Sequence, residues 1–265
     1  MYLAVLASMI HGLTVLGAIE VAQREKGFTK GLFEWIRRAP WGNPVFSGMF
    51  ISLIGFGFLG GISGVMMGTE QLNMIIHNTV YVPGHFHATV VIGTTLAFMA
   101  ITYFLIPTLF NREMILPELA KWQPYLFGFG MALVCLALMG AGTLGAPRRH
   151  RDISFAGAGQ PYEYPGTAHL MLAIMGIGAL IAAVGGALYI LIVVGSLLWG
   201  KRLDTGRYGI ERTVLRMPVA TAITGHGGAG FAAPGTFVFA LVFLTVFVLY
   251  YFVNWKYLST VWGLS

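Results

Sequence analysis

Cysteine is almost absent from this chain of 265 residues, whose single copy, Cys135, lies inside an apolar run. One cysteine cannot form an internal disulfide, nor can it supply an iron–sulfur cluster or a cysteine-only metal site. A metal bound here must use other ligands, and the seven histidines are the main candidates.

Charge is also scarce, since only 10% of the residues are charged, against about a quarter in soluble domains. The net charge of +6 comes from basic residues scattered among apolar blocks, so no stripe exists along which a nucleic-acid backbone could bind. The composition is instead typical of a membrane protein, being 57% hydrophobic. The 36 glycines suit close helix packing in lipid, where small residues let backbones approach.

Apolar blocks of the length needed to cross a bilayer, about 20 residues, occur six times. We place them near 1–21, 45–67, 82–110, 122–145, 166–200 and 234–258. The short connections leave no room for a soluble domain, and the longest, about 201–233, has the composition of a membrane-surface loop. The sequence therefore predicts an all-α, polytopic transmembrane helix bundle that forms a single domain over residues 1–265.

Lysine and arginine are distributed unevenly between the two sides of this bundle. The connections after the first, third and fifth spans hold most of the 16 cations, namely Arg24, Lys26, Lys30, Arg37, Arg38, Arg112, Lys121, Lys201, Arg202, Arg207, Arg212 and Arg216. The positive-inside rule assigns these connections to the cytoplasm and both termini to the outside. Arg148, Arg149 and Arg151 break this rule, which predicts an anionic partner beside them; contact with lipid phosphate or Asp152 is the alternative.

Three of the seven histidines, His77, His85 and His87, lie within eleven residues of one another. Pro83 is acceptable in the first turn of a helix, so we expect a helix to begin near it and to carry His85 and His87. Positions i and i+2 of an α-helix are about 200° apart, so these two imidazoles should point to opposite sides. This geometry disfavours a single metal ion held by both rings, for which i and i+4 would serve better.

Three interpretations of the His85–His87 pair remain open at this point. Each imidazole could be an axial ligand of its own heme, one on each face of the helix. Both rings could instead form structural hydrogen bonds to neighbouring helices. A third possibility is an isolated metal or proton-relay site, since ionisable residues inside a span are often functional.

The segment from His77 to His87, followed by the apolar run to Leu105, resembles the loop and tenth transmembrane helix of subunit I of the heme–copper oxidases. The Pro83-Gly84 pair is similar to the B family, and Ala146-Pro147-Arg148-Arg149 resembles the paired arginines that follow in these proteins. The six spans as a whole resemble helices eight to thirteen, the C-terminal half of that subunit.

The resemblance implies a role for each of these residues. His85 would be the proximal ligand of a high-spin heme where dioxygen is reduced, which makes it the catalytic candidate. His87 would be an axial ligand of a low-spin heme. Arg148 and Arg149 would bind heme propionates, with His77 and Asn73 close to those of the high-spin heme.

The resemblance further implies a cytochrome c oxidase type of terminal oxidase, which reduces dioxygen to water and translocates protons across a prokaryotic plasma membrane. The family's copper ligands have no counterpart in this sequence, so a partner chain that carries them with the N-terminal helices is expected. Subunit II, the lipid bilayer and an electron donor, which would be cytochrome c, a copper protein or quinol, are the other expected partners. The alternatives are a nitric oxide reductase-like subunit and a heme-free membrane scaffold or transporter-like subunit.

Overall fold

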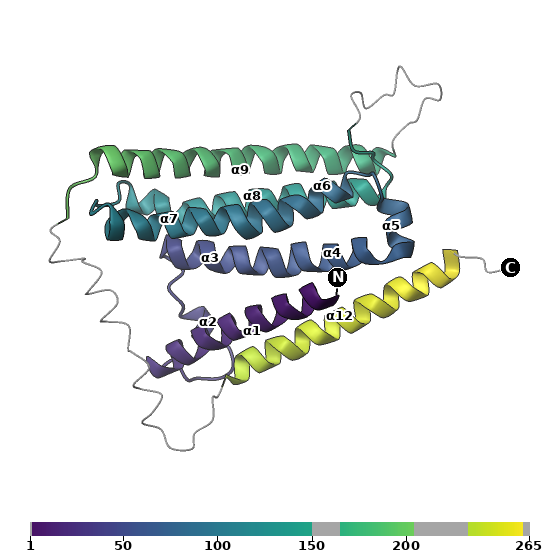
Figure 1. Ribbon diagram of the computed structural model, residues 1–265, viewed down its shortest axis with the longest axis horizontal. Helices are drawn as coiled ribbons and strands as arrows, with labels where there is room; N and C mark the ends of the chain where they lie inside the picture. Colours follow the sequence, from purple (N-terminus) through teal and green to yellow (C-terminus); the bar gives the residue numbers. More distant parts are fainter. Residues whose placement is uncertain (1, 150–164, 204–232, 262–265) are drawn as a thin grey trace. The chain divides into compact units, whose positions relative to one another are not determined.

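The computed structural model describes residues 2–149, 165–203 and 233–261 (Figure 1). Regular secondary structure in these ranges is helical throughout. Two isolated bridges, Thr79 with Pro147 and Arg112 with Arg202, are the only β-type pairings in the described part. The predicted all-α class is thus confirmed, while most of the predicted surface loop 201–233 and Arg151 lie outside the described residues.

The long helical segments coincide with the six apolar blocks, and each end lies within five residues of its predicted position. They are α1 (Tyr2–Glu25), Pro44–Gly68, Tyr81–Leu109, α8 (Pro117–Thr143), α9 (Gly166–Trp199) and α12 (Pro234–Val261). By length and composition, Pro44–Gly68, Tyr81–Leu109, α8 and α9 can cross a membrane. Two short helices, α2 (Glu34–Arg37) and α5 (Glu70–Ile76), lie in the connections and were not expected.

The described helices fall into two compact units. One unit spans Pro40–Gly225 and contains the four segments long and apolar enough to cross a membrane. The other combines Met1–Ala39 with His226–Ser265 and contains α1, α2 and α12. Whether the chain is a single domain stays a prediction.

In the unit Pro40–Gly225 the long helices lie side by side (Figure 1). Local signals fix the starts of two of them, because Pro44 and Pro117 occupy first-turn positions, where the missing N–H has no partner to lose. The Asn43 side chain caps the first of these helices by accepting from the backbone N–H of Val45 at 2.9 Å. The core is formed largely by Tyr81–Leu109 and α8, with Ala88, Ile92, Leu96, Val134 and Cys135 buried between them.

Two π-helical stretches interrupt the long helices. The segment Pro44–Gly68 consists of α3 (Pro44–Ile54), η1 (Gly55–Gly61) and α4 (Ile62–Gly68). The segment Tyr81–Leu109 consists of α6 (Tyr81–Phe86), η2 (His87–Thr95) and α7 (Leu96–Leu109). The two π stretches pack on each other so closely that a Cβ on Gly60 would lie 2.7 Å from Cγ2 of Thr89. Because π-turns are rare and concentrate at functional sites, this pair indicates that a functional site lies close to it.

The unit formed by α1, α2 and α12 contains a carboxylate with no exposure to solvent. Glu20 accepts hydrogen bonds from the backbone N–H groups of Gly235 and Thr236, at 2.9 and 2.6 Å, and from the Thr236 hydroxyl. Arg24, one turn further along α1, forms an ion pair with it at 2.8 Å. A carboxylate at the positive end of a helix is electrostatically favourable, so Glu20 joins the start of α12 to α1.

Glycines on α9 offer a test of the α8–α9 contact. A Cβ on Gly178 would lie 2.8 Å from the carbonyl oxygen of Gly130 and 3.0 Å from the backbone nitrogen of Val134, whereas one on Gly176 would meet nothing within 4 Å. We expect Gly178→Ala to destabilise the protein by about 1–3 kcal/mol, because backbone atoms cannot move aside easily. Gly176→Ala is the matched control and should be neutral or slightly stabilising.

The buried thiol of Cys135 provides the readout, since it reacts with a maleimide only when the core opens. Labelling of the Cys135 peptide is followed as detergent-solubilised protein is heated. A lower labelling midpoint is expected for Gly178→Ala alone. Equal midpoints for the two variants would show that α8 and α9 are not packed as described.

Candidate functional site

The two motifs singled out in the sequence are joined by backbone hydrogen bonds. The N–H of Val80 donates to the carbonyl oxygen of Ala146 at 2.8 Å, and the N–H of Arg148 donates to that of Asn78, also at 2.8 Å. Asn78 makes this turn with a φ of 60°, a left-handed conformation in which asparagine is tolerated better than most residues. The histidine segment and the arginine pair, about 70 residues apart in sequence, therefore form one structure.

His85 lies on α6 and faces α4. Its Nδ1 is 2.9 Å from Oγ of Ser63, a side chain only 3% exposed. The imidazole also lies against Gly64, where a Cβ would come within 3.0 Å of Cε1 of the ring. His85 is half-buried, and its ring also has a hydrogen bond to the backbone of Gly60. When Nδ1, the nitrogen beside Ser63, carries the proton, Nε2 has the lone pair that a ligand requires.

His87, at the start of η2, has a different partner. Its Nδ1 lies 2.7 Å from the carbonyl oxygen of Pro83, one turn earlier on the same helix. A carbonyl oxygen can only accept, so Nδ1 must carry the proton and Nε2 the lone pair. Hydrogen bonding of one ring nitrogen to a backbone carbonyl is the usual way in which a metal-binding histidine is oriented. His87 can thus offer Nε2 to a metal.

The helix predicted to begin near Pro83 begins at Tyr81 in the structure, as α6, and Pro83 lies in its first turn. In the loop between α5 and α6, the hydroxyl of Thr79 donates to the carbonyl oxygen of Ile76 at 2.6 Å and so stabilises the turn before α6. The phenyl ring of Phe86, between the two histidines, is 56% exposed. An apolar side chain so exposed at this point leaves a surface on which a flat apolar group or another helix can pack.

The guanidinium group of Arg148 has one hydrogen-bond partner in the chain and one buried N–H without a partner among the described residues. Its Nη2 donates to Oδ1 of Asn78 at 2.8 Å, while Nε is buried and has no hydrogen-bond acceptor among the described residues. The ion pairs in the described ranges, Glu20–Arg24 and Glu118–Lys121, do not involve it. A buried guanidinium N–H without an acceptor is costly, so Arg148 can hold an external anion such as a carboxylate.

The other predicted site residues lie nearby in the chain but are exposed. Arg149 has a φ of 66° and an exposed side chain. His77 and Asn73 lie at the end of α5, and the N–H of His77 donates to the carbonyl oxygen of Asn73 at 2.7 Å. Neither of these two side chains forms a hydrogen bond with another described residue. The structure therefore joins Arg148 to the histidine loop directly, and His77 only through its neighbour Asn78.

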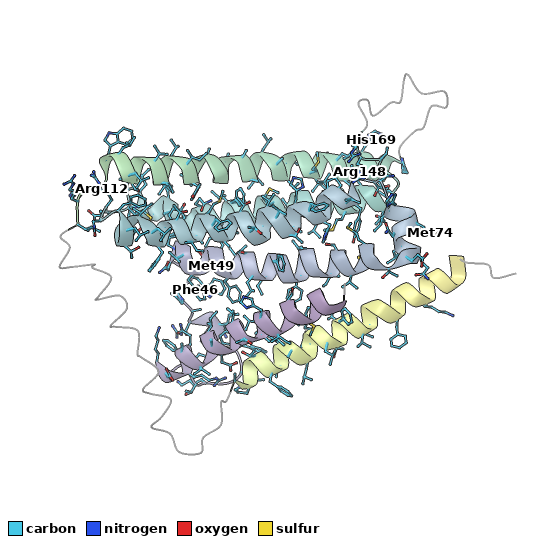
Figure 2. All side chains as sticks on the ribbon, in the orientation of Figure 1. Phe46, Met49, Met74, Arg112, Arg148 and His169 are labelled. Atoms are coloured by element: carbon cyan, nitrogen blue, oxygen red, sulfur yellow. The ribbon has the colours of Figure 1, made fainter. Side chains whose placement is uncertain are left out.

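Figure 2 shows Arg148 and His169 at the end of the helices where α9 begins, and Arg112 at the opposite end. Arg112 lies in the connection that follows Tyr81–Leu109, and Arg148 in the connection between α8 and α9. Their positions agree with the prediction that these two connections lie on opposite sides of a membrane. No group of three or more histidine, cysteine, aspartate or glutamate side chains capable of holding a metal ion occurs in the described ranges. A metal at His85 or His87 would therefore not be held by such a group of described side chains alone.

Sequence reasoning missed three residues of this site. Ser63 and Gly64 contact His85 from another helix, and Asn78 connects Arg148 to the loop. The run Gly60-Gly61-Ile62-Ser63-Gly64 was a usable signal, because small residues clustered in an apolar helix indicate close approach of a neighbour.

Comparison with known proteins identifies the family. The family described as Cytochrome C and Quinol oxidase polypeptide I matches residues 1–181, and the chain belongs to this family. The earlier resemblance to heme–copper oxidase subunit I is thereby confirmed, while the B-family assignment stays a prediction. The protein is accordingly a multi-pass membrane protein.

Individual relatives agree with this assignment. The chain is 37% identical over 144 residues to a cytochrome c oxidase subunit 1 of Thermus thermophilus. This alignment covers 54% of this chain and 25% of the relative. It is 30% identical over 199 residues to a probable quinol oxidase subunit 1 of Staphylococcus haemolyticus, covering 72% of this chain and 28% of the relative. These alignments thus span about a quarter of each relative.

A solved structure described as a heme-copper terminal oxidase dimer has a similar fold. The TM-score is 0.59 at 29% sequence identity, and the match covers 67% of this chain and 32% of that one.

Asn78 allows the joint between the two motifs to be tested. Asn78→Gly keeps the left-handed backbone but removes the amide that binds Arg148, so a loss of about 0.5–1.5 kcal/mol is expected. Asn78→Ala also strains the backbone and should cost about 1 kcal/mol more. The measurement is the thermal unfolding midpoint of each variant; a glycine variant less stable than the alanine variant would contradict the turn geometry.

Proposed function

We propose that this chain is the heme-ligating part of the catalytic subunit of a terminal respiratory oxidase, which reduces dioxygen to water and couples this reaction to proton translocation. The observation that carries the proposal is the state of the two imidazoles. His85 and His87, two residues apart on one helix, both have Nδ1 engaged by the chain, an arrangement that suits binding of a metal through Nε2.

The division of roles follows the family resemblance. His85 is the proposed proximal ligand of the high-spin heme and therefore the catalytic residue, and His87 is the proposed axial ligand of the low-spin heme. Two separate heme sites agree with the different surroundings of the rings, one of which contacts α4 while the other is bonded within its own helix. A single ion shared by both rings would need them on one face of the helix.

The propionate site is proposed at Arg148 and Arg149, with His77 and Asn73 beside it. The unsatisfied Nε of Arg148 fits this role, because a guanidinium with one N–H bonded to an amide retains donors for a carboxylate. The amide of Asn78 binds the guanidinium without neutralising its positive charge. The charge thus remains available for an acidic group that approaches from outside the described residues.

Bound hemes would supply the electron-transfer and oxygen-reducing chemistry of the complex. The chain would contribute axial ligands, cationic contacts and an apolar surround. The copper site and the remaining helices are proposed to come from outside these 265 residues, from a partner chain. Subunit II and an electron donor of the cytochrome c, copper protein or quinol class complete the proposed assembly in a prokaryotic plasma membrane.

Heme spectra of the assembled complex test the two ligands separately. The wild type should contain two spectrally distinct hemes. His87→Ala should remove the low-spin signal, and His85→Ala should abolish carbon monoxide binding to the ferrous high-spin heme, because each variant removes one axial imidazole. Absorption spectra of purified membranes, with and without carbon monoxide, provide the measurement.

His11→Ala serves as the control, since His11 is an exposed histidine on α1 and is not one of the proposed ligands. It should leave both signals unchanged. Retention of both signals in the His85 and His87 variants would overturn the ligand assignment, and complete absence of heme from the wild-type complex would favour a heme-free membrane scaffold.

A further inference from the structure

The hydroxyl group of Ser63 lies among three possible hydrogen-bond partners. Its Oγ is hydrogen-bonded to the carbonyl oxygen of Leu59, is 3.0 Å from that of Gly60, and is 2.9 Å from Nδ1 of His85. The side chain is almost fully buried at the junction of η1 and α4. Water therefore does not compete for this hydroxyl.

Proton counting links the directions of these hydrogen bonds to one another. The hydroxyl has one proton, and the carbonyl oxygens of Leu59 and Gly60 can only accept. When Ser63 donates to one of these carbonyls, its oxygen lone pair can accept only from a protonated Nδ1 of His85. The proton on the neutral imidazole is then at Nδ1, and Nε2 carries the lone pair that a metal requires.

The position of Ser63 in its helix explains why its hydroxyl donates to the backbone. At the end of η1 the N–H of Ile62 is shared between the carbonyl oxygens of Phe58 and Leu59, four and three residues earlier. A serine in a helix commonly bonds back to the carbonyl oxygens four and three residues earlier, which for Ser63 are those of Leu59 and Gly60. The reverse arrangement, with Ser63 donating to Nδ1, would withdraw that donor and place the imidazole proton on Nε2.

We propose that Ser63 is a positioning residue for His85, an inference that rests on the proposed heme function. Ser63 holds the imidazole in the tautomer that exposes Nε2 and, by accepting from Nδ1, increases the electron donation of the ring to iron. Gly64 complements it, because the ring occupies the space that a side chain at this position would fill.

The two proposed heme ligands differ in how this control is exerted. The acceptor for His87 is the backbone carbonyl of Pro83, which no substitution removes. His85 has a hydrogen bond to the backbone of Gly60 and also a side-chain partner on another helix, Ser63, which can be changed without altering the helix that carries the histidine. A change at Ser63 should therefore affect the high-spin heme alone, with the low-spin heme as an internal reference.

Resonance Raman spectroscopy of the ferrous complex tests this proposal. Ser63→Ala removes the side-chain acceptor, so the iron–histidine stretching frequency of the high-spin heme should fall and its midpoint potential should rise. The apparent affinity for that heme should fall roughly 10- to 100-fold. Ser63→Cys, which keeps a side chain of similar shape with a weaker acceptor, should shift the frequency and the potential in the same directions by smaller amounts.

Ser52→Ala is the matched control. Ser52 is also a buried serine on the segment Pro44–Gly68, and its hydroxyl donates to the carbonyl oxygen of Gly93 on the same partner helix, away from His85. It should leave frequency and potential at wild-type values. If heme is present and Ser63→Ala has the wild-type frequency and potential, the inference is overturned. Where the alanine variant does not fold, unchanged values in Ser63→Cys overturn it in the same way. Absence of the high-spin heme from the wild type overturns the proposed function instead.

Discussion

A histidine on an apolar helix has two ring nitrogens, and each must be satisfied in surroundings that offer little water. The unmet hydrogen bond of a buried polar group costs several kcal/mol in hydrocarbon-like surroundings, of the order of 2–7 kcal/mol. In this protein Nδ1 of both His85 and His87 is satisfied within the chain. Nε2 is therefore the ring nitrogen that remains for a metal to bind.

This arrangement depends on how closely two long helices approach. The contact of Gly60 with Thr89, and that of Gly55 with the side chain of Ile92, are possible because neither glycine has a side chain. At these positions the two π stretches face each other, and Ser63, shortly after η1, lies opposite His85, shortly before η2. A larger residue at Gly60 would separate the helices and lengthen the Ser63–His85 hydrogen bond. The packing of the small residues and the hydrogen bonding of the imidazole thus both depend on the same crossing of two helices.

Much of the fold could be predicted from local patterns. Apolar length located the six long helices, and the prolines at positions 44 and 117 explain two of their starts. The π stretches could not be predicted, because their alternative pitch depends on a neighbouring helix rather than on the propensities of their own residues. The same limit applies to the site. Spacing indicated His85 and His87, whereas Ser63 becomes relevant only when a residue 22 positions away is brought within 2.9 Å.

The arginine pair shows how a charge rule and a contact combine. The excess of cations at Arg148 and Arg149 was visible in the sequence as a departure from the positive-inside trend. The structure adds that the residue meeting Arg148 is an amide, Asn78, which orients the guanidinium through one N–H and leaves its charge uncompensated. A carboxylate in place of that amide would orient the arginine equally well but would also neutralise it, and so weaken its attraction for an anion. The amide therefore suits a cation that is positioned by its own chain and neutralised by another molecule.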